Sequence, residues 1–303
     1  MHRKKVNIVE VGPRDGLQNE SVFFSTKEKA EFIGRMIKSG IRRLEVASFV
    51  HPGRVPAMAD AEALLEMLPD LDDVSYIGLV LNLRGAERAV KTKVNEIGCV
   101  LVASETFGQK NQGQTIEEGH KAVADILEFS RTHGKLAGVT IAAAFGCPYE
   151  GEVPAARIID IAQRVAESEP MEIALADTIG VGVPGEVRDL FGALKEKIPH
   201  IPLRGHFHNT RNTGIANAYA AFEGGAVTLD ASLGGIGGCP FAPDATGNIA
   251  TEDLIYLLNR SSVATGISLK SLIENSQWMA GKLGRVLPSL VSRAGDFPVR
   301  HQA

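Results

Sequence analysis

The sequence has few cysteines and no long hydrophobic run. Cys99, Cys147 and Cys239 are too few and too scattered for a disulfide framework, so reduced thiols are expected. No window approaches the roughly 18 consecutive apolar residues of a membrane-spanning helix. The opening residues, MHRKKVNIVE, lack the apolar segment of a signal peptide. These absences predict a cytoplasmic protein with no membrane partner.

The sequence also lacks blocks of like charge. Its formal net charge is −4, and no five or six residues of one sign follow one another. This excludes the electrostatic footprint of a nucleic-acid-binding protein. Hydrophobic residues make up 44% of the chain and charged residues 22%, which is typical of a globular protein with a sizeable core. We therefore expect a small-molecule partner.

Short β-branched runs alternate with longer amphipathic stretches along the chain. The runs predict eight strands, at 5–11, 43–49, 75–81, 97–103, 137–144, 171–176, 202–207 and 227–233. Helical spacing follows at 26–39, 117–132, 154–168, 185–196, 214–223 and 251–259, with weaker signals after the second and third strands. Ser25 and Glu28 predict a capping box for the first helix, and Gly40 its end.

This alternation predicts an α/β fold, the (β/α)₈ TIM barrel, which typically needs ~250 residues. The barrel would occupy about 5–260, and 261–303 would form a C-terminal helical extension and tail. An open doubly wound sheet shares the alternation, but no G-x-G-x-x-G follows the first strand. No Pro-, Gly- or Ser-rich linker interrupts 1–260, so a single domain over 1–303 is expected.

Polar residues gather where the predicted strands end. Active sites of TIM barrels lie at the carboxyl ends of the strands. The residues at or near those ends are Arg14 and Asp15 after the first strand, Glu45 in the second, Asp177 after the sixth, His206 and His208 in and after the seventh, and Asn248 after the eighth. We expect these side chains to share one end of the barrel.

His206 and His208 form the sharpest of these signals. Side chains two apart on a strand point the same way, so both imidazoles could reach one ion. Spacing alone equally allows two histidines satisfied by backbone or water. With Asp15 and Asn248 at equivalent depth, the mixed nitrogen and oxygen set suits Mg²⁺ or Mn²⁺, with Zn²⁺ or Co²⁺ as alternatives.

Two further residues have both a chemical and a plainer interpretation. Arg14 could hold an oxygen that gains negative charge, or could form an ion pair with Glu45 or Asp177 that only orders the barrel mouth. The glycine-rich segment 232–248 is typical of a loop that closes over a site. Cys239 would then be a proton carrier or reactive thiol; alternatively the segment is a turn with an incidental cysteine.

Two long motifs, VEVGPRDGLQNE and SLGGIGGCPFAPDATGNIATED, lie near the two ends of the segment predicted to form the barrel. They resemble the opening motif and the second signature of the 3-hydroxy-3-methylglutaryl-CoA (HMG-CoA) lyases, a family within the DRE-TIM metallolyase superfamily. SFVHPGRVPAMAD, SETFGQKN and EIALADTIGVGVPG match in order, so the resemblance covers nearly all of 5–260. Wider relatives include isopropylmalate and homocitrate synthases and 4-hydroxy-2-oxoacid aldolases.

The resemblance implies a metal-dependent carbon–carbon lyase that cleaves HMG-CoA to acetyl-CoA and acetoacetate. Asp15, His206, His208 and Asn248 would hold Mg²⁺ or Mn²⁺, and Arg14 would support the thioester oxygen. Further roles implied are proton transfer by Asp15 or His206, proton delivery to the enolate by Cys239, and support by the carboxylates of Glu45 and Asp177.

Departures from the family pattern leave the acyl group open. Ser21, Asn209, Arg211 and Asp244 stand where the family usually has other residues, and Arg211 could anchor a substrate carboxylate. A related 3-hydroxyacyl-CoA, or a Claisen-type synthase or aldolase reaction, is the alternative.

Three lysines are candidates for contacts with the phosphates of coenzyme A. Lys91, Lys93 and Lys110 could meet its phosphates or be ordinary solvated lysines. Barrels of this size commonly pair, so a homodimer is compatible with the sequence.

Overall fold

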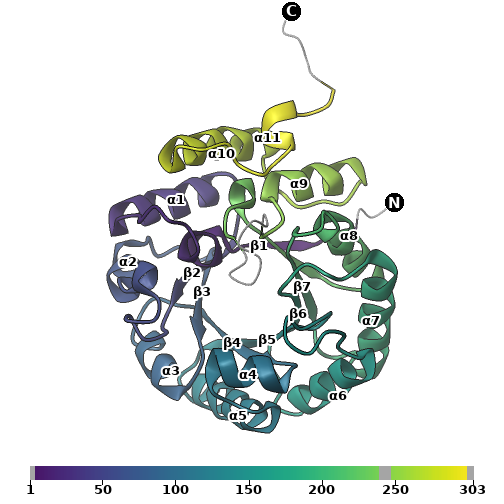
Figure 1. Cartoon of the computed structure of the whole chain (residues 1–303). Helices are drawn as coiled ribbons and strands as arrows, with labels where there is room; N and C mark the ends of the chain where they lie inside the picture. Colours follow the sequence, from purple (N-terminus) through teal and green to yellow (C-terminus); the bar gives the residue numbers. More distant parts are fainter. Residues whose placement is uncertain (1–3, 239–246, 299–303) are drawn as a thin grey trace, which may run out of the picture.

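Eight parallel strands close into a barrel in chain order, with the helices outside it (Figure 1). The computed structural model describes residues 4–238 and 247–298. The strands are β1 Asn7–Glu10, β2 Arg43–Ser48, β3 Ser75–Val80, β4 Glu96–Val102, β5 Leu136–Ala142, β6 Ile173–Asp177, β7 Leu203–Phe207 and β8 Thr228–Ala231. The TIM-barrel prediction is confirmed, and each predicted strand overlaps an observed one.

Helices cover the outer face of the barrel, and two more follow it. They are α1 Thr26–Lys38, α2 Ala61–Met67, α3 Leu83–Ala89, α4 Glu105–Gln112, α5 Ile116–Thr132, α6 Ala155–Ala166, α7 Pro184–Lys197, α8 Gly214–Gly224, α9 Thr251–Arg260, α10 Leu269–Leu283 and α11 Val291–Ala294. The predicted C-terminal helices are present as α10 and α11, with α10 against α1 and α9 (Figure 1). No helix of the described residues is both long and apolar enough to cross a bilayer.

Local signals in the sequence act as predicted at the start of α1. The Ser25 side chain accepts a hydrogen bond from the Glu28 backbone N–H at 3.3 Å, and Glu28 accepts one from the Ser25 N–H at 3.0 Å. Gly40, after the helix, has a φ of +102°, a conformation that favours glycine. Helix α4 was not predicted, although Ser104 caps it through the Phe107 N–H.

Glu10, at the end of β1, joins three segments behind the barrel mouth. One carboxylate oxygen accepts hydrogen bonds from the backbone N–H groups of Gly12 (3.0 Å) and Leu233 (2.8 Å). The other accepts one from the Thr251 hydroxyl at 2.7 Å. Burial raises the pKa of Glu10 from 4.5 to about 8. This one side chain therefore holds the turn after β1, the segment after β8 and the start of α9 together.

We predict that Glu10→Gln flattens the pH dependence of stability. Because burial raises the pKa of Glu10 in the folded state from 4.5 to about 8, its contribution is greatest below pH 4.5 and declines as the pH rises to about 8. Glutamine keeps an acceptor for the two N–H groups and has no charge to bury. Thermal unfolding by circular dichroism between pH 5 and 8.5 should show a smaller decline in Tm for the variant. Equal declines would contradict the prediction.

Candidate metal centre

A short π-helical turn, η1 (Gly12–Gly16), carries Arg14 and Asp15 over the barrel mouth. The backbone N–H groups of Arg14, Asp15 and Gly16 all donate to the Val11 carbonyl, at 3.2, 2.8 and 3.2 Å. A π-turn of this kind is rare and is frequently found at functional sites. It explains how two adjacent charged residues can both reach the barrel mouth directly after an apolar strand.

Asp15, His206 and His208 form a group that could hold a metal ion. Each offers one ligand atom, and these atoms all lie within 4.8 Å of one another. His208 Nε2 lies 4.0 Å from Asp15 Oδ2, and the two imidazole ring centroids are 5.2 Å apart. The structure thus brings together Asp15 and the two histidines that the sequence suggested could share one ion. A carboxylate and two imidazoles are a donor set that fits a divalent cation.

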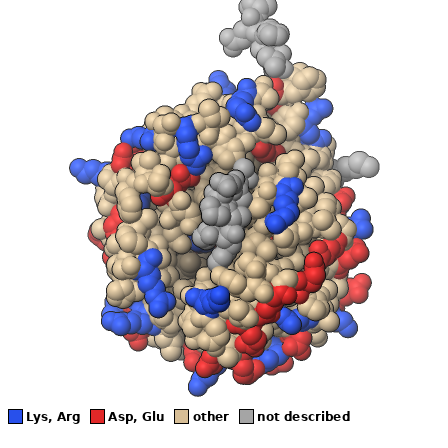
Figure 2. Space-filling view, in the orientation of Figure 1, with Lys and Arg blue, Asp and Glu red and all other residues tan. Residues whose placement is uncertain are grey.

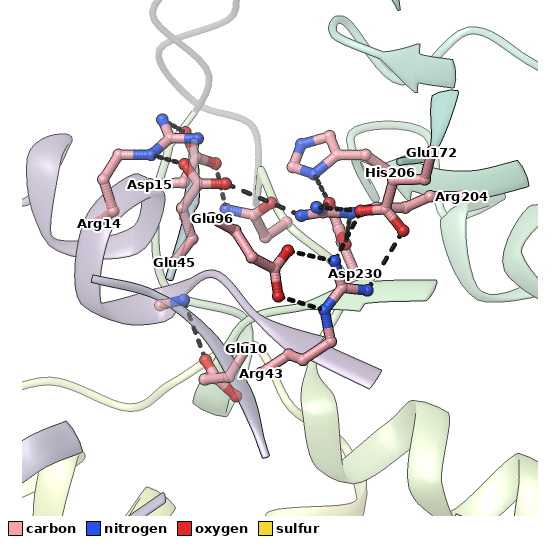
Figure 3. Close-up of polar contacts among 12 residues, drawn as sticks. Glu10, Arg14, Asp15, Arg43, Glu45, Glu96, Glu172, Arg204, His206 and Asp230 are labelled. Carbon is pink, nitrogen blue, oxygen red and sulfur yellow. Dashed lines mark hydrogen bonds and ion pairs between the residues drawn. The ribbon is translucent and has the colours of Figure 1, made fainter. Parts of the chain in front are cut away.

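The two histidines differ in their hydrogen-bond partners and in the direction of their pKa shifts. The ring of His206 shares a 3.0 Å hydrogen bond between Nδ1 and the Asp230 carboxylate, which leaves Nε2 toward the group (Figure 3). Burial lowers the pKa of His206, but the hydrogen bond and charge of Asp230, together with the charge of Asp15, raise it overall. Burial, followed by the charge of His206, lowers the pKa of His208 to about 4. His208 Nδ1 is buried with no hydrogen-bond partner among the described residues.

Asp15 is held ionised and in place. Burial acts to raise its pKa, but Arg14 and then the two histidines lower it well below the usual range. Asn248 Nδ2 donates to Asp15 Oδ2 at 2.7 Å, and an isolated β-bridge pairs Asn248 with His208. In this orientation the Asn248 amide nitrogen donates a hydrogen bond to Asp15. A half-turn of the amide group would point its oxygen, in place of its nitrogen, toward the metal group.

A connected set of buried ion pairs continues from this group into the barrel (Figure 3). The members are Arg14, Arg43, Arg204, Asp15, Glu45, Glu96, Glu172 and Asp230. Among these residues, three guanidinium groups against five carboxylates leave two negative charges. Buried charge without a partner is costly. A divalent cation at the Asp15 group would neutralise the set.

Arg14 is paired and still faces the cavity. Its Nε donates a hydrogen bond to the Glu45 carboxylate, and its Nη1 donates one to Asp15 at 2.7 Å. The ion pair between Arg14 and Glu45 that the sequence allowed is therefore present. Its Nη2 makes no hydrogen bond to the described residues. Arg14 nevertheless lines the main cavity, of about 400 Å³. Figure 2 shows this face of the molecule, with a hollow near its centre and Lys and Arg side chains around its rim.

Other residues singled out from sequence lie outside the metal group. Asp177 accepts backbone hydrogen bonds from Val181 (2.9 Å) and Gly182 (3.0 Å), and so holds the loop after β6. Burial raises the pKa of Asp177. Arg211 donates to the carbonyls of Ile179 and Gly180 and does not line the cavity. Cys239 and Asp244 lie outside the described residues.

The lysines considered for coenzyme A do not line the cavity either. The Lys110 ammonium lies 4.2 Å from the Tyr149 ring centroid, and Lys93 donates to the Leu68 carbonyl at 3.1 Å. Lys91 lines a small separate surface hollow. Arg54 was not considered, and it lines both the main cavity and an adjoining hollow that contains Arg84 and Arg88.

We predict that Asp230→Asn weakens metal binding. The change removes the charge that orients His206 and pairs with Arg204, and losing such a partner typically costs about 10–100-fold in metal affinity. Titration with Mn²⁺ followed by electron paramagnetic resonance measures it. Asp189→Asn, on the exposed face of α7, is the matched control. An affinity equal to that of the unchanged protein would contradict the role of Asp230.

Comparison with known proteins identifies the family of the chain. The HMGL-like family model matches residues 5–279. The (R)-citramalyl-CoA lyase of Chloroflexus aurantiacus is 42% identical, over 96% of this chain and 95% of its own. A hydroxymethylglutaryl-CoA lyase of Bacillus subtilis is 37% identical, over 94% and 96%. An HMG-CoA lyase from Acinetobacter baumannii, solved in complex with coenzyme A and 3-methylmalate, is similar with a TM-score of 0.92 and 36% identity, over 99% of this chain and 98% of that one. The chain therefore belongs to the HMGL-like family of carbon–carbon lyases.

Proposed function

We propose that the protein is a metal-dependent lyase that cleaves the C2–C3 bond of a 3-hydroxyacyl-CoA whose C3 is tertiary. The substrate is HMG-CoA, and the products are acetyl-CoA and acetoacetate. The observation that carries the proposal is the convergence of Asp15, His206 and His208 within 4.8 Å, beside Arg14 and on one cavity. Family membership and the coenzyme A complex of an HMG-CoA lyase at 36% identity support the thioester.

The reaction needs two kinds of stabilisation, and the site has groups for both. When C2–C3 breaks, its electron pair remains on C2 and the thioester oxygen gains negative charge. Arg14 lines the cavity, its Nη2 makes no hydrogen bond to the described residues, and Glu45 and Asp15 fix the guanidinium plane. A divalent cation, held by Asp15, His206, His208 and the Asn248 amide oxygen, would polarise the C3 hydroxyl when bound.

Proton transfer completes the reaction. The C3 hydroxyl must lose its proton as its oxygen becomes a carbonyl, and C2 must gain one. Asp15 and His206 lie at the group that would face the hydroxyl, and each is a candidate base. Cys239 is our candidate for the proton donor to C2. Asp177 would act indirectly, by holding the loop after β6.

A second substrate is favoured by a specific observation. The (R)-citramalyl-CoA lyase of Chloroflexus aurantiacus is 42% identical, against 37% for the HMG-CoA lyase of Bacillus subtilis. Citramalyl-CoA has its carboxylate directly on C3, and the same bond cleavage would give acetyl-CoA and pyruvate. Incubation of each thioester with Mg²⁺ or Mn²⁺, followed by separate assays for acetoacetate and pyruvate, distinguishes the two. Release of neither product would contradict the proposal.

We predict that Arg14→Lys lowers kcat by about 10²–10³-fold, the usual cost of losing one donor to a developing oxyanion. Lysine keeps the charge but has no planar fork to be held by Glu45 and Asp15 together. Steady-state kinetics on the better substrate measure the effect. Arg42→Lys is the matched control, because Arg42 is an exposed arginine paired with Asp73. Full activity of Arg14→Lys would remove Arg14 from the mechanism.

A further inference from the structure

The chain that follows α10 is held against the chain that follows β8. The Ser289 N–H donates to the Gly234 carbonyl at 3.1 Å, and the Ser289 hydroxyl donates to Asp253 of α9 at 2.9 Å. Leu287 is buried, and a side chain on Gly234 would overlap it. Both α10 and α11 also contact α9 (Figure 1). The C-terminal extension therefore packs on the part of the chain that leads from β8 to the metal group.

Glu20 connects this extension to the site. Arg285, two positions after the end of α10, donates from Nη2 to Glu20 Oε1 at 2.6 Å. The same oxygen accepts a hydrogen bond from the Gly237 N–H at 3.2 Å. The Glu20 side chain is only 7% exposed, and within residues 4–238 and 247–298 Arg285 is the only cation that pairs with it. A nearly buried carboxylate thus takes its countercharge from the C-terminal extension.

Gly237 carries this contact to the metal group. Its carbonyl accepts a hydrogen bond from the Asn248 N–H at 3.4 Å. A methyl group built on Gly237 would lie 2.9 Å from both Asn248 Nδ2 and Gly16 Cα, closer than side-chain carbons approach such atoms. It would also lie 3.1 Å from the Asp15 carbonyl oxygen. Gly237 is therefore packed between the η1 turn and Asn248, and a displacement of Gly237 would move the groups that hold the Asp15 carboxylate.

The charge of Arg285 keeps the Glu20 carboxylate in this place. Without a cation, a nearly buried carboxylate is costly, so it turns toward water or takes up a proton. A carboxylate turned toward water would leave the Gly237 N–H without its acceptor. A protonated one would accept more weakly, because hydrogen bonds to ionised groups are the stronger ones. Loss of Arg285 would therefore loosen Gly237 in either case.

Resting on the proposed function, we propose that Arg285 is a positioning residue of the lyase site. Arg285 fixes Glu20, Glu20 fixes Gly237, and Gly237 fixes Asn248 beside Asp15. None of Arg285, Glu20 and Gly237 lines the main cavity, so their effect on the reaction is indirect. The C-terminal extension is thus a working part of the site, and one exposed ion pair at its start sets how well the metal group is ordered.

Hydrogen–deuterium exchange in the metal-free protein tests the contact directly. Arg285→Gln should speed exchange of the Gly237 N–H by about tenfold or more, because local opening then costs less free energy. Mass spectrometry with fragmentation to single residues measures the rate. Lys282→Gln is the matched control, since Lys282 also lies on the C-terminal extension and pairs with Glu28 of α1 at 2.9 Å. It should leave the rate unchanged. An unchanged rate in Arg285→Gln overturns the inference.

A double-mutant cycle separates positioning from a general loss of stability. Arg285→Gln should weaken Mn²⁺ binding, followed by electron paramagnetic resonance, by about tenfold, and Arg285→Lys should restore most of the affinity because it keeps the ion pair. Glu20→Gln keeps an acceptor for the Gly237 N–H and has no charge to neutralise. In that background Arg285→Gln should have no further effect. Equal losses of affinity in both backgrounds overturn the inference.

Turnover extends the same cycle. We expect kcat on the better of HMG-CoA and citramalyl-CoA to fall by about tenfold in Arg285→Gln and to stay unchanged by it in the Glu20→Gln background. Circular dichroism checks folding, and Arg285→Met repeats each test if Arg285→Gln is unfolded. A kcat that neither variant lowers overturns the inference and leaves the proposed function standing. If the unchanged protein cleaves neither thioester, the proposed function fails instead, and amide exchange and Mn²⁺ affinity still decide the role of Arg285.

Discussion

Paired charge inside the barrel is the constraint on which the site depends. Glu172 is bonded to both Arg43 and Arg204, and Arg204 continues to Asp230, which orients His206. None of these side chains could be buried alone without a large cost, and breaking one pair would leave its partner charged in a medium of low dielectric. The geometry at the barrel mouth thus depends on residues near the opposite ends of the strands.

This arrangement divides the interior into two halves with different properties. One side, mainly β1, β2, β7 and β8, carries the metal group and most of the ion-paired residues, whose partners also include Glu96 on β4 and Glu172 before β6, and the other side carries small and aliphatic residues. In most barrels of this type bulky branched residues fill the interior. Here ion pairs and the metal group occupy part of the interior, and small residues on β4 to β6 line the cavity beside them.

Much of the fold and part of the candidate site could be predicted from the sequence. The strands could be predicted because β-branched runs alternate with helical spacing. Their carboxyl ends could be placed together because a parallel barrel has all of them at one rim. His206 and His208 were visible because residues two apart in an extended chain share a face. Asp15 was predicted with them, since a carboxylate after β1 must lie at the same rim.

The partners inside the barrel could not be predicted in the same way. Asp230 resembles any acid within an apolar strand, and its pairing with His206 and Arg204 depends on a register between strands that the sequence does not state. Helix α4 was missed because its polar face and short length resemble a loop. Arg211 looked like a substrate anchor from its position after β7, but its backbone turns it toward the β6–α7 loop.

Gly237 and Asn248, which are eleven positions apart in the sequence, lie side by side next to the metal group. The Asn248 N–H donates to the Gly237 carbonyl at 3.4 Å, and Asn248 is paired with His208 by an isolated bridge. Gly237 and Asn248 are therefore held next to each other, and Asn248 is also held beside Asp15 and His208. One amide thus ties a segment that ends at position 238 and one that begins at position 247 to the same end of the barrel.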